Sequence, residues 1–227
     1  MSLLAAARVR LFSTPVTWWA AVLAVVASAG LGAARLIVEG DELPVTVGGT
    51  QTAETFGRTV ILVMAVLAAT VERRLVRQAS PGRRQVLANA MVVGGWSALV
   101  GLAAGFGSWA LATVVDPEVD LGLHTAADWR AVLGQSVLFA LTALLGLGVG
   151  LLVRAPLPAV AIVLGWTQLV EGLAFWAPGV QRWLPFFAAN QVAGWHPGLP
   201  LSAGWYGLYF AAFCLLVFTA GVVRDKN

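Results

Sequence analysis

Charge is scarce in this chain. Only 11% of its 227 residues are Asp, Glu, Lys or Arg, whereas about a quarter of the residues of a soluble globular domain are charged. Hydrophobic residues make up 59%, and the mean hydropathy is +0.83. The sequence has no long polar block that could form a separate soluble domain. We therefore predict a single transmembrane domain over residues 1–227.

Residues that carry chemistry are equally rare. The only cysteine is Cys214, in an apolar run, which excludes an internal disulfide and a cysteine-based metal cluster. Predicted spans contain no histidine pair, no glutamate pair and no serine with a partner base. We therefore expect no catalytic residue and no metal site, so a membrane-embedded enzyme is disfavoured. No Gly-x-x-x-x-Gly-Lys-Ser/Thr motif occurs, so the chain has no P-loop for ATP.

Long apolar runs predict an all-α integral membrane protein with six transmembrane helices. The expected spans are about 16–37, 57–72, 87–115, 131–153, 157–177 and 204–223. The residues before the first span can form an N-terminal helix along the interface. Residues 178–203 are too apolar for a free loop and too interrupted for a span. We expect re-entrant or interfacial helices there, between spans five and six.

The second span is short because charged residues bound it. Arg58 stands at one end and Glu72 at the other, so we expect Arg58 to snorkel into the adjacent interface. Glu54 precedes this span in an acidic connection, where we expect it to be solvated.

Glycines recur inside two predicted spans. Such small residues allow helices to approach closely, so we predict helix contacts at these positions. They are Gly94, Gly95, Gly101 and Gly105 in the third span, and Gly146, Gly148 and Gly150 in the fourth.

Basic residues predict the orientation. The even number of spans places both termini on one side, and ten of the 14 Lys and Arg residues lie on that side. By the positive-inside rule this side is cytoplasmic. Because the basic residues gather at span ends without interleaved aromatics, we expect membrane lipid around the chain and no nucleic-acid partner.

One connection combines acids with a histidine. Asp116, Glu118, Asp120 and Asp128 surround His124. A metal site is conceivable from these residue types, but Pro117 and the irregular spacing favour solvated loop charges.

Three segments resemble a known family. They are Arg10–Trp19 (RLFSTPVTWW), Glu72–Asn89 (ERRLVRQASPGRRQVLAN) and Trp183–Val192 (WLPFFAANQV). Together with the span pattern, they make the chain similar to the membrane subunit, or permease, of a type-2 ABC exporter. The resemblance implies a multi-pass protein of the cell membrane that pairs with a second permease copy or a homologue. Cytoplasmic ABC ATPase subunits would supply ATP and Mg, so this chain would bind no cofactor and would not itself be the enzyme.

The resemblance also implies roles for two sets of residues. The N-terminal segment and the loop after the second span, residues 72–84, which we call the basic loop, would contact the ATPase. The residues concerned are Arg8, Arg10, Glu72, Arg73, Arg74, Arg77, Arg83 and Arg84. The segment between spans five and six would form the extracellular gate, with Trp183, Phe186, Phe187 and Asn190. For the arginines, the alternative is that they only set topology.

Glu171 is an acid well within a predicted span. Thr167 and Gln168 precede it by about one helical turn, so the three polar side chains fall on one stripe. The stripe could line a substrate pathway or form a hydrogen-bonded helix contact. The alternative function is a secondary, ion-coupled transporter that uses Glu171.

Overall fold

The computed structural model describes residues 3–39, 46–75, 82–173, 176–181, 183–192 and 201–224. Within these ranges every regular element is a helix and none is a strand. The prediction of an all-α protein is therefore confirmed.

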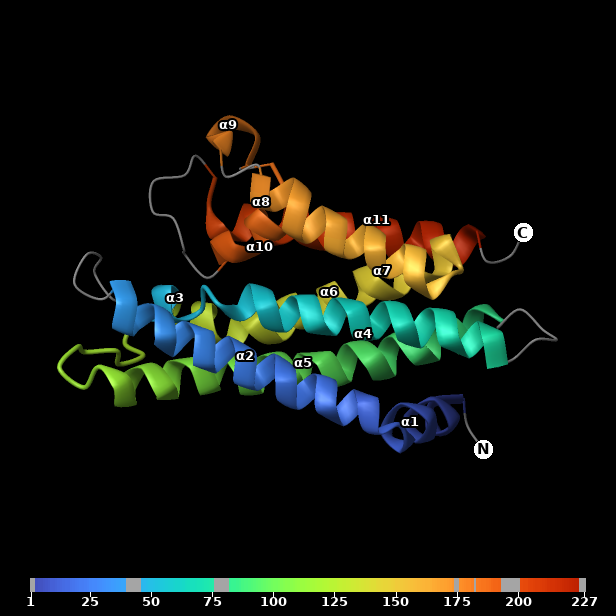
Figure 1. Ribbon diagram of the computed structural model, residues 1–227, viewed down its shortest axis with the longest axis horizontal. Helices are drawn as coiled ribbons and strands as arrows, with labels where there is room; N and C mark the ends of the chain where they lie inside the picture. The colour runs from blue at the N-terminus through green and yellow to red at the C-terminus, as the bar shows by residue number, and fades with distance from the viewer. Residues whose placement is uncertain are drawn as a thin grey trace.

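The long helical segments of the described residues run along the molecule (Figure 1). They are α2 (Pro15–Glu39), α4 (Glu54–Leu75), α5 (Arg83–Val115), α6 (Ala126–Val153), α11 (Ala203–Arg224), and α7 (Pro156–Leu164), which continues through the π-helical turn η1 (Gly165–Val170) into α8 (Glu171–Leu173). Helix α1 (Leu3–Ser13) and the last turn of α11 lie at one end, which we call the α1 end. Short helices α3 (Val47–Thr50), α9 (Pro178–Gln181) and α10 (Pro185–Val192) lie at the other, the α10 end.

Among the described residues, five segments are long and apolar enough to cross a membrane. They are Pro15–Ala34, Arg83–Val115, Ala126–Val153, Pro156–Leu173 and Ala203–Arg224. These correspond to predicted spans one, three, four, five and six. Helix α4 is less apolar than α2, α5, α6 and α11, because it carries charged residues near both ends. It nevertheless packs along α6 and α2, in the middle of the bundle.

Local signals start and stop several helices. Thr125 and Asp128 form a reciprocal capping box at the start of α6. Pro156 begins α7, where its missing N–H costs nothing. Arg154 ends α6 with a left-handed backbone, φ 62°. Its guanidinium donates to the Arg224 carbonyl at 2.6 Å, which satisfies an acceptor in the last turn of α11.

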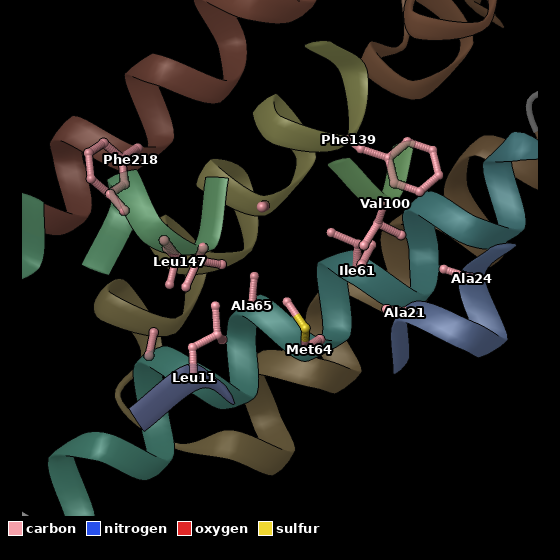
Figure 2. Close-up of a cluster of buried hydrophobic side chains, with 14 of the residues drawn as sticks. Leu11, Ala21, Ala24, Ile61, Met64, Ala65, Val100, Phe139, Leu147 and Phe218 are labelled. Carbon is pink, nitrogen blue, oxygen red and sulfur yellow. The ribbon is translucent and has the colours of Figure 1, made fainter. Parts of the chain in front are cut away.

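The central core joins most of the helices. Figure 2 shows Leu11 of α1, Ala21 and Ala24 of α2, Ile61, Met64 and Ala65 of α4, Val100 of α5, Phe139 and Leu147 of α6, and Phe218 of α11. Helix α1 thus belongs to the same cluster as the spans, because its buried face packs on α5.

Glycines set the closest helix crossings. A Cβ placed on Gly146 would lie 2.6 Å from the Leu62 carbonyl of α4, and one on Gly148 would lie 2.7 Å from Cα of Phe218 in α11. Gly101 and Gly105 face α6 in the same way, at 2.6 and 2.7 Å from its carbonyls. The predicted glycine contacts are confirmed at these positions. At Gly94 and Gly95 they are wrong, because a Cβ there would meet nothing within 4 Å.

Candidate functional site

The predicted ATPase-coupling residues whose backbone the structure describes lie at the α1 end. Arg8 lies on α1, and Arg83 and Arg84 begin α5, with all three side chains exposed. The backbone at Glu72, Arg73 and Arg74 forms the last turns of α4. Arg10 has its backbone in α1, and Arg77 lies outside the described residues. Contact between α1 and α5 brings these elements to one face. Their role toward an ATPase stays a prediction.

At the opposite end, Glu171 holds the start of α10. Its Oε1 accepts hydrogen bonds from the Phe186 backbone N–H and from Trp166 Nε1, both at 3.0 Å. Its Oε2 accepts from the Phe187 backbone N–H at 2.9 Å. The first N–H groups of a helix have no partner within the helix and carry partial positive charge. The carboxylate therefore satisfies α10 in both hydrogen bonding and charge.

The other end of α10 is matched by a positive charge. Arg130 of α6 donates from Nε to the Val192 carbonyl, at 3.1 Å. A guanidinium at a helix C-terminus complements the negative end of the helix dipole. Helix α10 is thus held between a carboxylate from α8 and a guanidinium from α6.

The π-helical turn changes the predicted polar stripe. A π-helix bonds residue i to i+5 and takes more than four residues per turn, so the spacing of an ordinary helix does not apply between Gly165 and Val170. Glu171 bonds to Trp166, five residues before it. Thr167 donates to the Val163 carbonyl at 2.9 Å, and Gln168 is exposed. A substrate-pathway role for Thr167, Gln168 and Glu171 stays a prediction.

The predicted gate residues lie on and just before α10. Phe186 and Phe187 are buried, and the Phe186 ring meets Phe210 of α11 edge to face at 5.8 Å. Trp183 is exposed, and its carbonyl accepts from the Tyr209 hydroxyl at 2.7 Å. Asn190 turns inward to α4. The gate residues therefore share one short segment, while their role as a gate stays a prediction.

Arg58 does not snorkel. Its side chain is only 1% exposed, and its Nη2 donates to Asn190 Oδ1 of α10 and, at 3.1 Å, to Thr55 Oγ1. Thr55 also donates to Asn190 Oδ1 at 3.0 Å. The expectation was wrong because α10, more than a hundred residues later in the chain, covers this part of α4 and offers a polar partner.

Glu54 is not solvated either. It is the first residue of α4, is fully buried, and accepts from the Ser108 hydroxyl of α5 at 2.7 Å. Gln51 and Gln135 are buried around the same turn of α5. Sequence reasoning missed this polar cluster. The available signal was the presence of Ser108 and Gln135 on the same spans as the packing glycines.

The acidic connection between α5 and α6 carries exposed charges. His124 Nε2 lies 3.4 Å from Asp120 Oδ1, and both side chains are largely solvent-accessible. The Gly122 backbone N–H and then His124 hold the pKa of Asp120 below its usual range. No group of three or more His, Cys, Asp or Glu side chains converges on a possible metal position in the part of the chain that the structure describes.

Comparison of the chain with protein-family models, with curated proteins and with solved structures finds no match. The functional argument therefore depends on the residues themselves.

Proposed function

We propose that this chain is the permease subunit of an ATP-driven ABC exporter. It works as a dimer with a second copy or a homologue and is driven by separate ATPase subunits. Helix α4 crosses the membrane as the second of its six spans. At 22 residues α4 is about 33 Å long, enough for a hydrocarbon layer of about 30 Å. The proposal rests on the sequence resemblance and on the arrangement below.

The observation that carries the proposal is the separation of the two ends. Exposed Arg8, Arg83 and Arg84 lie at the α1 end, beside the end of α4. The short helices α9 and α10 lie at the α10 end. A soluble motor that docks on arginines at the α1 end would face the cytoplasm under the positive-inside rule.

Helix α4 provides the physical connection between the ends. Its last turns lead into the basic loop in the sequence, and its first turns bond to α10 through Arg58 and Thr55. A packed helix moves as a unit because its contacts do not deform continuously. Displacement of α4 at the α1 end would therefore pull on α10, which is the segment proposed as the gate.

Removal of basic charge from the end of α4 tests the proposal. We expect the triple variant Arg73→Ala, Arg74→Ala and Arg77→Ala to lower transport-coupled ATP hydrolysis by about tenfold, the scale of a typical coupling energy. Insertion and thermal stability should remain, because the change leaves the apolar sequence of α4 intact. The measurement is ATPase activity of the co-expressed complex in liposomes, together with co-purification of the ATPase.

A control removes basic residues from the C-terminal part of the sequence. The double variant Arg224→Ala and Lys226→Ala takes positive charge from the last turn of α11 and from the sequence after it, and it should leave coupling intact. Unchanged coupling in the triple variant would show that its arginines set topology only. Equal loss in both variants would point to general surface charge rather than to a docking site.

Orientation can be tested with single cysteines, because native Cys214 is fully buried. Gly49 and Ala126 lie at the α10 end, and Gly82 lies at the other. We expect Gly49→Cys and Ala126→Cys to react with an impermeant maleimide in intact cells, and Gly82→Cys to react only after the cells are opened. Labelling of Gly82→Cys in intact cells would contradict the proposed topology.

A further inference from the structure

Buried oxygen atoms without a hydrogen-bond partner gather near Glu54. Within the described residues, five such oxygens come from α2, the turn after α3, α4 and α6: Ser28 Oγ, Gln51 Oε1, Thr52 Oγ1, Glu54 Oε2 and Gln135 Oε1. Burial of a polar atom without a partner costs about 1–3 kcal/mol. Native proteins rarely leave several such atoms together, so a guest that satisfies them is expected.

Contacts with one turn of α5 bring the three strongest acceptors together. Gln51 Nε2 donates to the Gly105 carbonyl at 3.1 Å, and Ser108 donates to Glu54 Oε1 at 2.7 Å. A Cβ on Gly105 would lie 3.3 Å from Cγ of Gln135, so this side chain covers the same turn. Because Gly105 has no side chain, polar side chains from the turn after α3, from α4 and from α6 can all reach this turn of α5.

The backbone carbonyls that accept from Gln51 and Gln135 fix the orientation of both side-chain amides. Gln51 donates from Nε2 to a carbonyl, and Gln135 donates from Nε2 to the Ala131 carbonyl at 3.3 Å. A carbonyl oxygen can only accept, so neither amide can be turned over without loss of this bond. Their Oε1 atoms therefore remain as acceptors, on side chains that contact the same part of α5 as Glu54.

Glu54 accepts from the neutral Ser108 hydroxyl, whereas the Arg58 guanidinium bonds to Asn190 and Thr55 and the Glu171 carboxylate bonds to the start of α10. A buried region of low dielectric disfavours a carboxylate without a cation in contact with it. A metal ion on the free Glu54 oxygen would supply this charge.

We propose that Glu54, Gln51 and Gln135 bind one small monovalent metal cation of the size of sodium. Hard cations prefer carboxylate, amide and hydroxyl oxygens. A proton on Glu54 would neutralise the charge but could donate to only one neighbour, which leaves an amide oxygen unsatisfied. A single cation engages all three acceptors, and the Ser28 hydroxyl lies beside Glu54 as a further oxygen. The site does not depend on the proposed permease function, because it lies at the α10 end and needs no ATPase.

Direct binding to the full chain in lipid nanodiscs tests this site. We expect saturable retention of radioactive sodium that unlabelled sodium displaces and choline does not. Sodium should also raise the melting temperature by about 4 °C relative to choline at equal ionic strength, since a ligand that binds only the folded state stabilises it. Glu54→Gln keeps the acceptor for Ser108 but removes the charge, and it should weaken sodium binding at least about tenfold.

Further variants separate the possible guests. Gln135→Leu removes a ligand without changing charge and should also weaken sodium binding, which keeps the test open if Glu54→Gln does not fold. Asp120→Asn removes an exposed acid and should bind sodium as the parent protein does. Absence of sodium retention, with a pH-dependent stability that Glu54→Gln abolishes, would overturn the proposal in favour of a proton. If the stability depends on neither sodium nor pH, the proposal is overturned and buried water is the expected occupant of the site.

Discussion

Gly148→Leu should separate α6 from α11 and destabilise the protein by about 3 kcal/mol, at the upper end of the cost of overpacking. A Cβ at Gly148 would lie 2.7 Å from Cα and 2.8 Å from the backbone nitrogen of Phe218. Backbone atoms cannot rotate away as a side-chain end can, so the helices themselves must move. Gly146→Leu should have a similar effect against α4, where the nearest atom is the Leu62 carbonyl. The measurement is the melting temperature of the purified protein in a fixed detergent.

Gly95→Leu is the matched control, because it makes the same chemical change at an exposed position of α5. A Cβ there meets nothing within 4 Å. We expect the melting temperature of this variant to stay close to that of the parent. If Gly148→Leu and Gly95→Leu melt alike, the close approach of α6 and α11 is not a determinant of stability.

Glu171→Gln should release the start of α10, although glutamine has nearly the same shape as glutamate. The carboxylate accepts three hydrogen bonds through its two oxygens. A glutamine has only one acceptor oxygen, and its NH₂ would face a backbone N–H. The loss of a hydrogen bond to a charged group and an unsatisfied N–H together cost about 2 kcal/mol. Glu171→Leu removes every acceptor and should cost more.

Hydrogen exchange at Phe186 and Phe187 measures this effect. We expect faster exchange of their amides in Glu171→Gln, with little change in α5 and α6. Gln168→Leu is the control, because the Gln168 side chain is exposed and should leave α10 unaffected. Normal protection of α10 in Glu171→Gln, combined with a loss of transport, would instead support a role for Glu171 in the substrate pathway. A defect in both would mean that α10 must be docked for transport.

The contacts of Glu171 also bear on how an ion-coupled transporter would work. A coupling carboxylate must be able to exchange its bound ion or proton. Glu171 uses both oxygens to hold α10 and Trp166, so its hydrogen bonds would have to break in each cycle. This arrangement favours the hydrogen-bonded helix contact, one of the two alternatives that the sequence left open.

The sequence by itself determined the class of protein, most of the spans and several helix contacts. Long apolar runs predict membrane helices because the backbone N–H and C=O groups of a segment in lipid must find their hydrogen-bond partners within the segment. Capping residues and prolines act within one turn, so the starts of α6 and α7 depend on local residues such as Thr125 and Pro156. The Gly101 and Gly105 contact followed from spacing along one helix, whereas a Cβ at Gly94 or Gly95 on the same helix would meet nothing within 4 Å.

Only the tertiary structure decided the partners of the buried polar groups. Arg58 bonds to Asn190 across 132 residues, and Glu54 bonds to Ser108 across 54. Hydropathy and local periodicity describe one helix at a time, so they place a charged residue near a span end but cannot show what covers it. The π-helical turn before Glu171 was likewise visible only in the structure. Sequence reasoning assumes the periodicity of an ordinary α-helix, and this periodicity does not hold between Gly165 and Val170. Whether a charge reaches water, caps a helix or enters a polar cluster depends on which helices become neighbours.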